Sequence, residues 1–214
     1  MIHNSVTNLV SIKKEIQLKN DNTKIIAVSK TFSIENILPL IEFGHIDYGE
    51  NKVKEALDKW TNIKNENKSV KLHLIGKLQT NKVKLALGIF DYIHSLDSEK
   101  LAIKISEEQI KQEKKPKIFI QVNIGDEDQK SGLSKEKLGE FYKFCKNLNL
   151  DIIGTMCIPP VDQNPKKYFT EMNKINQALN FKELSMGMSS DYLEAIQNNA
   201  TFIRVGSKIF GSRG

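Results

Sequence analysis

The sequence is poor in the residues that build disulfide scaffolds and membrane spans. Of its 214 residues only two are cysteines and one is tryptophan, and no apolar run approaches the roughly 18 residues that indicate a transmembrane helix. The cysteines, Cys145 and Cys157, lack the paired spacing of a disulfide framework or a metal site, so we expect two free thiols in the core. The start of the chain has neither the basic nor the apolar segment of a secretory signal, which predicts a cytoplasmic protein without membrane association.

Positively charged residues exceed negatively charged ones only modestly. The sequence has 32 lysines and arginines against 26 aspartates and glutamates, a formal net charge of +6. The excess comes from lysines spread over most of the predicted helices, whereas a nucleic-acid groove would need clustered arginines or interleaved aromatic residues. We therefore expect no nucleic-acid partner. A hydrophobic content of 39% and a charged content of 27% are typical of a folded globular protein.

Apolar runs typical of buried strands alternate with amphipathic helical patterns along the sequence. Residues 24–30 carry a continuous apolar run with β-branched members, which indicates a strand covered on both faces, as in a parallel sheet. We predict strands at 24–30, 45–51, 71–76, 91–96, 117–123, 151–158, 183–188 and 201–205, each followed by a helical pattern. A further amphipathic helix at 2–20 precedes the first strand, and Pro39 predicts a kink or a break in the helix that follows it.

The number and spacing of these units predict the fold. Eight β/α units whose strands begin about 25 residues apart match the arithmetic of a closed (β/α)8 barrel, an α/β fold, here with an extra N-terminal helix. An open doubly wound sheet is the alternative, and it would usually carry a glycine fingerprint after the first strand, where this sequence has Ser29-Lys30-Thr31-Phe32. Because no linker interrupts the pattern, we expect a single domain over residues 1–214.

In such a barrel the functional face is formed by the carboxyl ends of the strands and by the loops that follow them. The residues predicted there are mostly neutral or basic: Lys30, Asn51, Gly76, Ser95, Asn123, Met156, Met188, Ser189, Arg204, Gly206 and Ser207. They include no pair of carboxylates of the kind that glycosidases use, and no cluster of His, Cys, Asp or Glu spaced for a metal. We therefore expect neither a metal site nor acidic catalysis.

Two features of this face suggest an anionic cofactor that carries an aldehyde. Lys30 either extends to solvent, as lysines usually do, or is a partly desolvated amine suited to forming a Schiff base. Ser189, Gly206 and Ser207 follow the seventh and eighth strands, where these barrels commonly bind phosphate, although each residue could also serve only as a helix cap or a turn. A strand-end lysine opposite two such loops suggests pyridoxal 5'-phosphate (PLP).

Several short segments, in this order, also carry a family resemblance. They are Ala27-Val28-Ser29-Lys30-Thr31, Tyr48-Gly49-Glu50-Asn51, His73-Leu74-Ile75-Gly76, Leu78-Gln79-Thr80-Asn81-Lys82, Gln121-Val122-Asn123, Lys130-Ser131-Gly132, Leu184-Ser185-Met186-Gly187-Met188-Ser189, Arg204-Val205-Gly206-Ser207 and Ile209-Phe210-Gly211. Through them the sequence resembles, over nearly its whole length, the YggS/PROSC family of PLP homeostasis proteins, which look like the barrel domain of alanine racemase standing alone.

The resemblance implies a role for particular residues. Lys30 would carry the cofactor as a Schiff base, and Asn51 would lie beside the ring. Ser189, Gly206 and Ser207 would hold the phosphate, and Arg204 would face the pyridine nitrogen. The set of expected cofactor-binding residues is completed by His73 and Met188, although a histidine inside a strand is more often an interior residue.

The same residues lead us to expect a protein that binds PLP without strong catalysis of its own. Guanidinium groups only donate hydrogen bonds, so a pyridine nitrogen opposite Arg204 stays unprotonated and withdraws electrons poorly. In the racemases that the chain resembles, the second acid/base group comes from a further domain. We therefore expect a protein that buffers PLP or delivers it to apo forms of PLP-dependent enzymes, and we assign no catalytic residue. The resemblance implies a monomer. A racemase or lyase with a minimal site, and a phosphate-binding enzyme that makes no Schiff base, are the alternatives.

Overall fold

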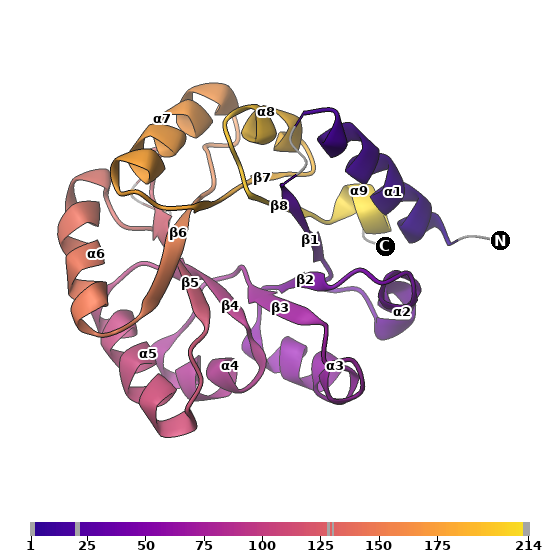
Figure 1. Cartoon of the computed structure of the whole chain (residues 1–214), viewed down its shortest axis with the longest axis horizontal. Helices are drawn as coiled ribbons and strands as arrows, with labels where there is room; N and C mark the ends of the chain where they lie inside the picture. Colours follow the sequence, from indigo (N-terminus) through magenta and orange to yellow (C-terminus); the bar gives the residue numbers. More distant parts are fainter. Residues whose placement is uncertain (1–2, 20–21, 128, 130, 212–214) are drawn as a thin grey trace.

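The strands close into a barrel. The structure, a computed structural model, describes residues 3–19, 22–127, 129 and 131–211. Its parallel strands lie in sequence order around a closed sheet, in which β1 pairs with both β2 and β8 (Figure 1). The strands are β1 (Lys24–Val28), β2 (Asp47–Glu50), β3 (Lys71–Leu74), β4 (Tyr92–Leu96), β5 (Lys117–Val122), β6 (Asp151–Cys157), β7 (Glu183–Met188) and β8 (Phe202–Val205). The predicted (β/α)8 barrel is confirmed.

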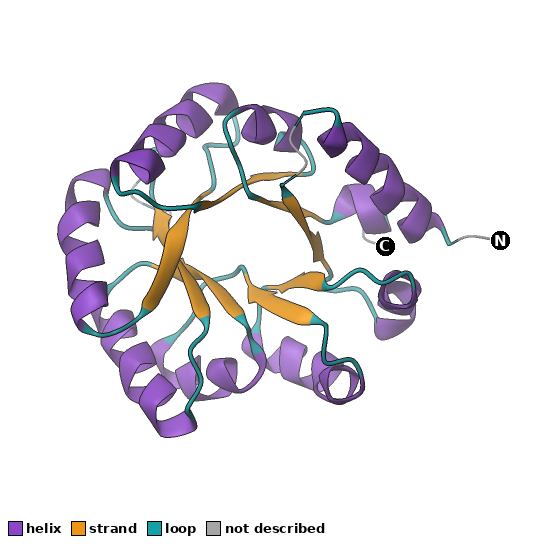
Figure 2. Ribbon diagram, viewed as in Figure 1, coloured by secondary structure: helices purple, strands orange, loops and turns teal. Residues whose placement is uncertain are grey.

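Helices surround the barrel as an outer ring (Figure 2). The helices are α1 (Asn4–Gln17), α2 (Ile34–Glu42), α3 (Val53–Glu66), α4 (Val83–Ile89), α5 (Glu99–Gln112), α6 (Leu138–Asn147), α7 (Pro165–Ala178), α8 (Tyr192–Gln197) and α9 (Ser207–Phe210), with single 3-10 turns at η1 (Thr80–Lys82) and η2 (Lys135–Lys137). Among the described ranges, no helix combines the length and the apolar character that crossing a bilayer requires.

The N-terminal helix and two local features refine the prediction from sequence. The helix expected at 2–20 is present as α1, although residues 2 and 20 lie outside the described part of the chain. Its Asn8 side chain donates to the carbonyl of Ile209 in α9 at 3.0 Å, so the two ends of the described chain lie together. Pro39 does not divide α2, which is one helix from Ile34 to Glu42. The short α9 is the helical segment that follows β8, although its bounds are not predicted from the sequence.

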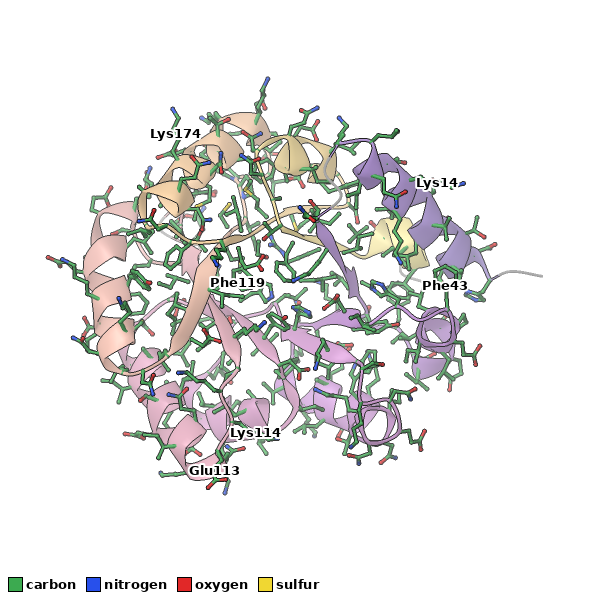
Figure 3. All side chains as sticks on the ribbon, in the orientation of Figure 1. Lys14, Phe43, Glu113, Lys114, Phe119 and Lys174 are labelled. Carbon is green, nitrogen blue, oxygen red and sulfur yellow. The ribbon has the colours of Figure 1, made fainter. Side chains whose placement is uncertain are left out.

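The barrel has two separate hydrophobic regions. The larger one lies between the outward faces of the strands and the helices, as the alternation of strand side chains requires. The smaller one fills the barrel interior and consists of Ile26, Tyr92, Phe119, Met156 and Phe202. Figure 3 shows Phe119 inside the ring of strands. The interior is therefore a packed core, and the space for a ligand lies at its ends.

Both cysteines are buried free thiols, as the sequence predicts. Burial raises the pKa of Cys145 and of Cys157 to about 12, because the thiolate loses its hydration. We expect neither thiol to react with Ellman's reagent at pH 8 in the folded protein, while both should react in 6 M guanidinium within about a minute. Fast reaction of one thiol without denaturant would contradict the buried placement.

Candidate functional site

A pocket of about 400 Å³ opens at the carboxyl ends of the strands. Among the residues that line it are Lys30, Asn51, Met188, Ser189, Arg204, Gly206 and Ser207, all predicted from the sequence. They come from the ends of β1, β2, β7 and β8 and from the following loops. Apolar walls are supplied by Val28, Phe32, Ile75 and Ile158. One amine, one guanidinium and several hydroxyls therefore share one concave space of the size usual for small ligands.

Lys30 lies in a strained turn that a hydrogen bond to a helix residue stabilises. β1 ends at Val28, and Lys30 follows two residues later in a half-buried position. The next residue, Thr31, has φ of 69°, a left-handed conformation that β-branched residues rarely adopt. Its backbone N–H donates to Glu55 Oε1 at 2.6 Å. This bond fixes the turn and with it the direction in which the Lys30 side chain leaves the backbone.

A fully buried carboxylate lies beneath this turn. Glu50 Oε1 accepts hydrogen bonds from Ser29 Oγ at 2.7 Å and from Trp60 Nε1 at 2.9 Å. Lys59 Nζ lies 3.0 Å from the same oxygen and also donates to the Ser29 carbonyl at 2.9 Å. Glu50 thereby ties the residue before Lys30 to α3. The second oxygen, Oε2, is buried without a hydrogen-bond partner among the described residues.

Asn51 is positioned by a close backbone approach. A Cβ atom at Gly76 would lie 2.4 Å from the Asn51 carbonyl oxygen, so only glycine lets the loop after β3 pass this point. Ile75 N donates to Glu50 O at 3.0 Å and holds the two loops together. Gly76 and Asn123 themselves line a neighbouring pocket that shares Asn51 with the first one.

The loops after β7 and β8 are joined directly. Gly187 has φ of 90°, and the pairing of β7 with β8 shifts register beside it, which turns the chain toward Ser189. Ser189 Oγ accepts from Gly206 N at 3.3 Å. Asp191 precedes α8, and its Oδ1 accepts from Met188 N at 2.6 Å rather than from a helix N–H. Burial raises the pKa of this carboxyl.

Arg204 forms the floor of the pocket. The side chain extends from β8 and is only 4% exposed. Its Nη1 donates to Ser185 Oγ at 2.8 Å and its Nη2 to the Cys157 carbonyl at 3.0 Å. Burial lowers the pKa of the guanidinium, but the ordinary value is so high that the group stays charged. A fixed cation with N–H groups left over therefore borders the pocket.

Three predicted residues lie elsewhere. His73 does not line this pocket: its ring is fully buried in the barrel interior, between Asp47 and His94. Ser95 and Met156, expected at strand ends, are also buried, and neither lines the pocket. The sequence analysis did not identify His94 and Ser185, although both lie inside predicted strands. His73 and His94 occupy inward positions of two successive strands, and this pattern could have indicated a polar cluster inside the barrel.

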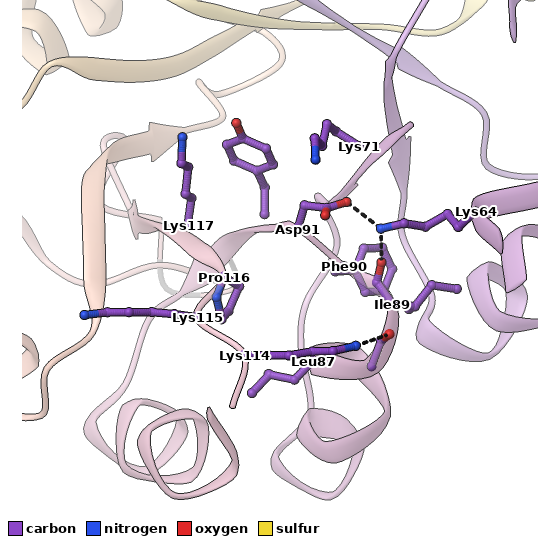
Figure 4. Close-up of a pocket in the computed structure, with 12 residues that line it drawn as sticks. Lys64, Lys71, Leu87, Ile89, Phe90, Asp91, Lys114, Lys115, Pro116 and Lys117 are labelled. Atoms are coloured by element: carbon purple, nitrogen blue, oxygen red, sulfur yellow. Dashed lines mark hydrogen bonds and ion pairs between the residues drawn. The ribbon is translucent and has the colours of Figure 1, made fainter. Parts of the chain in front are cut away.

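A second pocket, of about 430 Å³, lies at the opposite end of the barrel (Figure 4). Five lysines line it, but Lys64 is bound to Asp91 Oδ2 at 2.6 Å and Lys114 to the Gly88 carbonyl at 2.9 Å. Lys115 donates to Asn149 Oδ1 at 2.9 Å. Their ammonium groups do not converge on one point in Figure 4. The pocket at the carboxyl ends is therefore the candidate site.

The groups in that pocket fit PLP in their chemistry. The amine of Lys30 matches an aldehyde, and the Ser189 and Ser207 hydroxyls match a phosphate. Arg204 donates and matches a ring nitrogen that accepts. Within the ranges that the structure describes, no group of three His, Cys, Asp or Glu side chains is arranged to hold a metal ion.

Comparison with known proteins gives matches over most of the chain. Residues 5–214 match the family model described as alanine racemase, N-terminal domain. The pyridoxal phosphate homeostasis protein of Pasteurella multocida is 36% identical, over 96% of each chain. That of Aquifex aeolicus is 37% identical, over 89% of this chain and 87% of its own. The structure of PipY from Synechococcus elongatus with PLP bound superposes with a TM-score of 0.89 at 30% identity, over 97% of this chain and 100% of PipY.

Proposed function

The chain belongs to the family of pyridoxal phosphate homeostasis proteins, which share the fold of the alanine racemase N-terminal domain, and we propose that it binds PLP in the pocket at the carboxyl ends of its strands. The observation that carries this proposal is the convergence of Lys30, Arg204 and the Ser189 and Ser207 hydroxyls on one pocket of about 400 Å³. The groups come from the carboxyl ends of three strands, β1, β7 and β8, so their meeting is a property of the folded barrel.

Lys30 holds the cofactor covalently in this proposal. PLP would supply an aldehyde and Lys30 the amine that forms a Schiff base with it, with the aldehyde oxygen and the two amine protons released as water. The turn at Thr31 orients Lys30, and the apolar walls at Val28 and Ile75 limit access of water to the bond.

The remaining pocket residues hold the two ends of the cofactor. Ser189, Gly206 and Ser207 bind the phosphate, with Asn51 and Met188 beside the ring. Arg204 donates to the pyridine nitrogen and keeps it unprotonated, which disfavours carbanion chemistry. His73 does not touch the cofactor in this arrangement, because it lies in the interior. The relatives are named homeostasis proteins, which agrees with buffering or delivery rather than turnover.

The proposal extends to how the protein works in the cell. It acts as a cytoplasmic monomer that releases PLP to apo forms of PLP-dependent enzymes. Two free buried thiols suit a reducing compartment. The test is to load the protein with PLP, remove excess by gel filtration, and mix it with an apo-enzyme whose activity reports the transfer. Recovery of activity in proportion to the loaded protein is expected; steady turnover of an amino acid by the protein alone would overturn the non-catalytic part.

The phosphate contacts lead to a further prediction. A Ser207→Ala variant loses a hydroxyl that faces a doubly charged group, which costs about 1.5 kcal/mol and weakens PLP binding roughly tenfold. Pyridoxal, which lacks the phosphate, should bind the variant and the wild type equally. The affinities are measured by titration of the absorption band. Ser33→Ala, which removes an exposed hydroxyl outside the pocket, is the matched control and should bind PLP normally.

A further inference from the structure

A continuous chain of hydrogen bonds runs through the barrel interior from the candidate site to the opposite end. Arg204 Nη1 lies 2.8 Å from Ser185 Oγ, which lies 2.9 Å from His94 Nδ1. His94 Nε2 lies 3.0 Å from His73 Nδ1, and His73 Nε2 lies 2.9 Å from Asp47 Oδ1. The five residues come from β8, β7, β4, β3 and β2, so the chain crosses the barrel and ends at the first residue of β2.

The groups at the two ends of this hydrogen-bond chain determine which atom donates and which accepts in each of its bonds. Arg204 only donates, so Ser185 Oγ accepts from it; the Asp47 carboxylate only accepts, so His73 carries a proton on Nε2. Burial lowers the pKa of both His73 and His94, so both rings are neutral and each has a single N–H. His73 therefore accepts at Nδ1 from His94 Nε2. His94 then accepts at Nδ1, and the Ser185 hydroxyl proton points to it.

Aromatic rings enclose the chain. Tyr92 stacks on His73 with ring centroids 4.2 Å apart, and Phe119 stacks on His94 at 4.3 Å. Phe202 contacts both imidazoles, at 5.7 and 6.1 Å. Both histidine side chains are fully buried. In such surroundings an unsatisfied polar atom is costly and aligned hydrogen bonds strengthen each other, so the chain is held in its single arrangement.

We propose that this chain of hydrogen bonds positions the Arg204 guanidinium toward the cofactor; it runs through Ser185, His94 and His73 to Asp47. Asp47, at the far end of the barrel, determines which atom donates in each hydrogen bond. Because the Ser185 hydroxyl donates its proton to His94, a lone pair of its oxygen accepts from Arg204. These four are positioning residues. Only the cofactor part of this inference rests on the proposed function.

The first test needs no cofactor. In the apo protein labelled with 15N-histidine, long-range 1H–15N correlation at pH 7 should show His73 and His94 as neutral rings protonated on Nε2. Asp47→Ala should give signals of the other tautomer, whereas Asp151→Ala, which removes the carboxylate at the first residue of β6, should not. A charged ring, or an Nδ1–H tautomer at either histidine in the wild type, would overturn the direction assigned here.

The second test measures the effect on the cofactor. Ser185→Ala removes the acceptor of a charged donor, and PLP release from the variant should be about tenfold to hundredfold faster, with a shifted absorption maximum. Asp47→Ala should act in the same direction. Ser95→Ala is the matched control, since Ser95 Oγ is equally buried but lacks a hydrogen-bond partner among the described residues.

The outcomes separate the two proposals. If Ser185→Ala releases PLP at the wild-type rate with an unchanged spectrum, or if Ser95→Ala has the same effect as Ser185→Ala, the positioning role is wrong. If the wild type itself takes up no PLP, the proposed function fails, while the histidine tautomers still decide whether the directed chain exists.

Discussion

A Lys30→Ala variant that is mixed with PLP and then reduced with borohydride should carry no covalent label, whereas the wild type should carry one label on this residue. Reduction fixes only a C=N bond, and alanine has no amine to form one. The absorption band above about 400 nm, usual for a protonated Schiff base, should be absent as well. Digestion and mass spectrometry of the reduced proteins give the measurement.

The matched control is Lys77→Ala. Lys77 is an exposed lysine at the same end of the barrel and lines the neighbouring pocket, so it tests whether any lysine near the site takes the label. This variant should load like the wild type. Because Ser189, Arg204 and Ser207 remain in Lys30→Ala, PLP should still bind reversibly and be lost on dialysis. A label retained in Lys30→Ala, or scattered over surface lysines in the wild type, would contradict the proposed site.

A Glu50→Gln variant should lose about 3 kcal/mol of its free energy of unfolding, because the largely buried ammonium of Lys59 loses its fully buried carboxylate partner. Glu50 is fully buried and its Oε1 accepts from Lys59, Ser29 and Trp60, and an amide cannot match a carboxylate toward three donors. Urea unfolding followed by fluorescence gives the measurement. The single tryptophan of the chain, Trp60, reports on this cluster directly.

Loading with PLP should weaken in the same variant. Ser29 loses its charged acceptor, and Ser29 precedes Lys30 on the strained turn. Glu183→Gln is the control: its ion pair with Lys24, at 3.9 Å, is partly exposed, so the loss should stay below about 1 kcal/mol. Equal losses of unfolding free energy in the two variants would show that the contacts of Glu50 stabilise the fold no more than a partly exposed ion pair does.

The elements of the barrel were predictable because their patterns are local. A run such as 24–30 is apolar on both faces whatever its partners, and the predicted strand at 183–188 coincides with β7. The strained turn at Thr31 was not predictable, since a β-branched residue at φ of 69° follows from its bond to Glu55 in α3. Pro39 shows the same limit, because local propensity favours a break that the packed helix does not have.

The candidate site, too, was predictable from the sequence only in part. Lys30 and the serines of the last two loops follow from the sequence, because the carboxyl ends of parallel strands all point to one end of a barrel and their loops must meet there. Arg204 also follows from its place at a strand end, and the resemblance to a known family implied its role opposite the pyridine nitrogen. One predicted segment, Lys130-Ser131-Gly132, begins outside the described residues, so the structure does not place Lys130.

By itself, then, the sequence determined the order of strands and helices, the closed barrel and the face on which a cofactor would bind, since each depends on spacing along the chain. Only the tertiary structure decided that His73 turns away from the pocket and that His94 and Ser185 connect it to Arg204. These partners stand on strands far apart in sequence, up to 91 residues in the case of His94 and Ser185. Closure of the barrel brings them within 3 Å, and no periodicity within one strand reports such a contact.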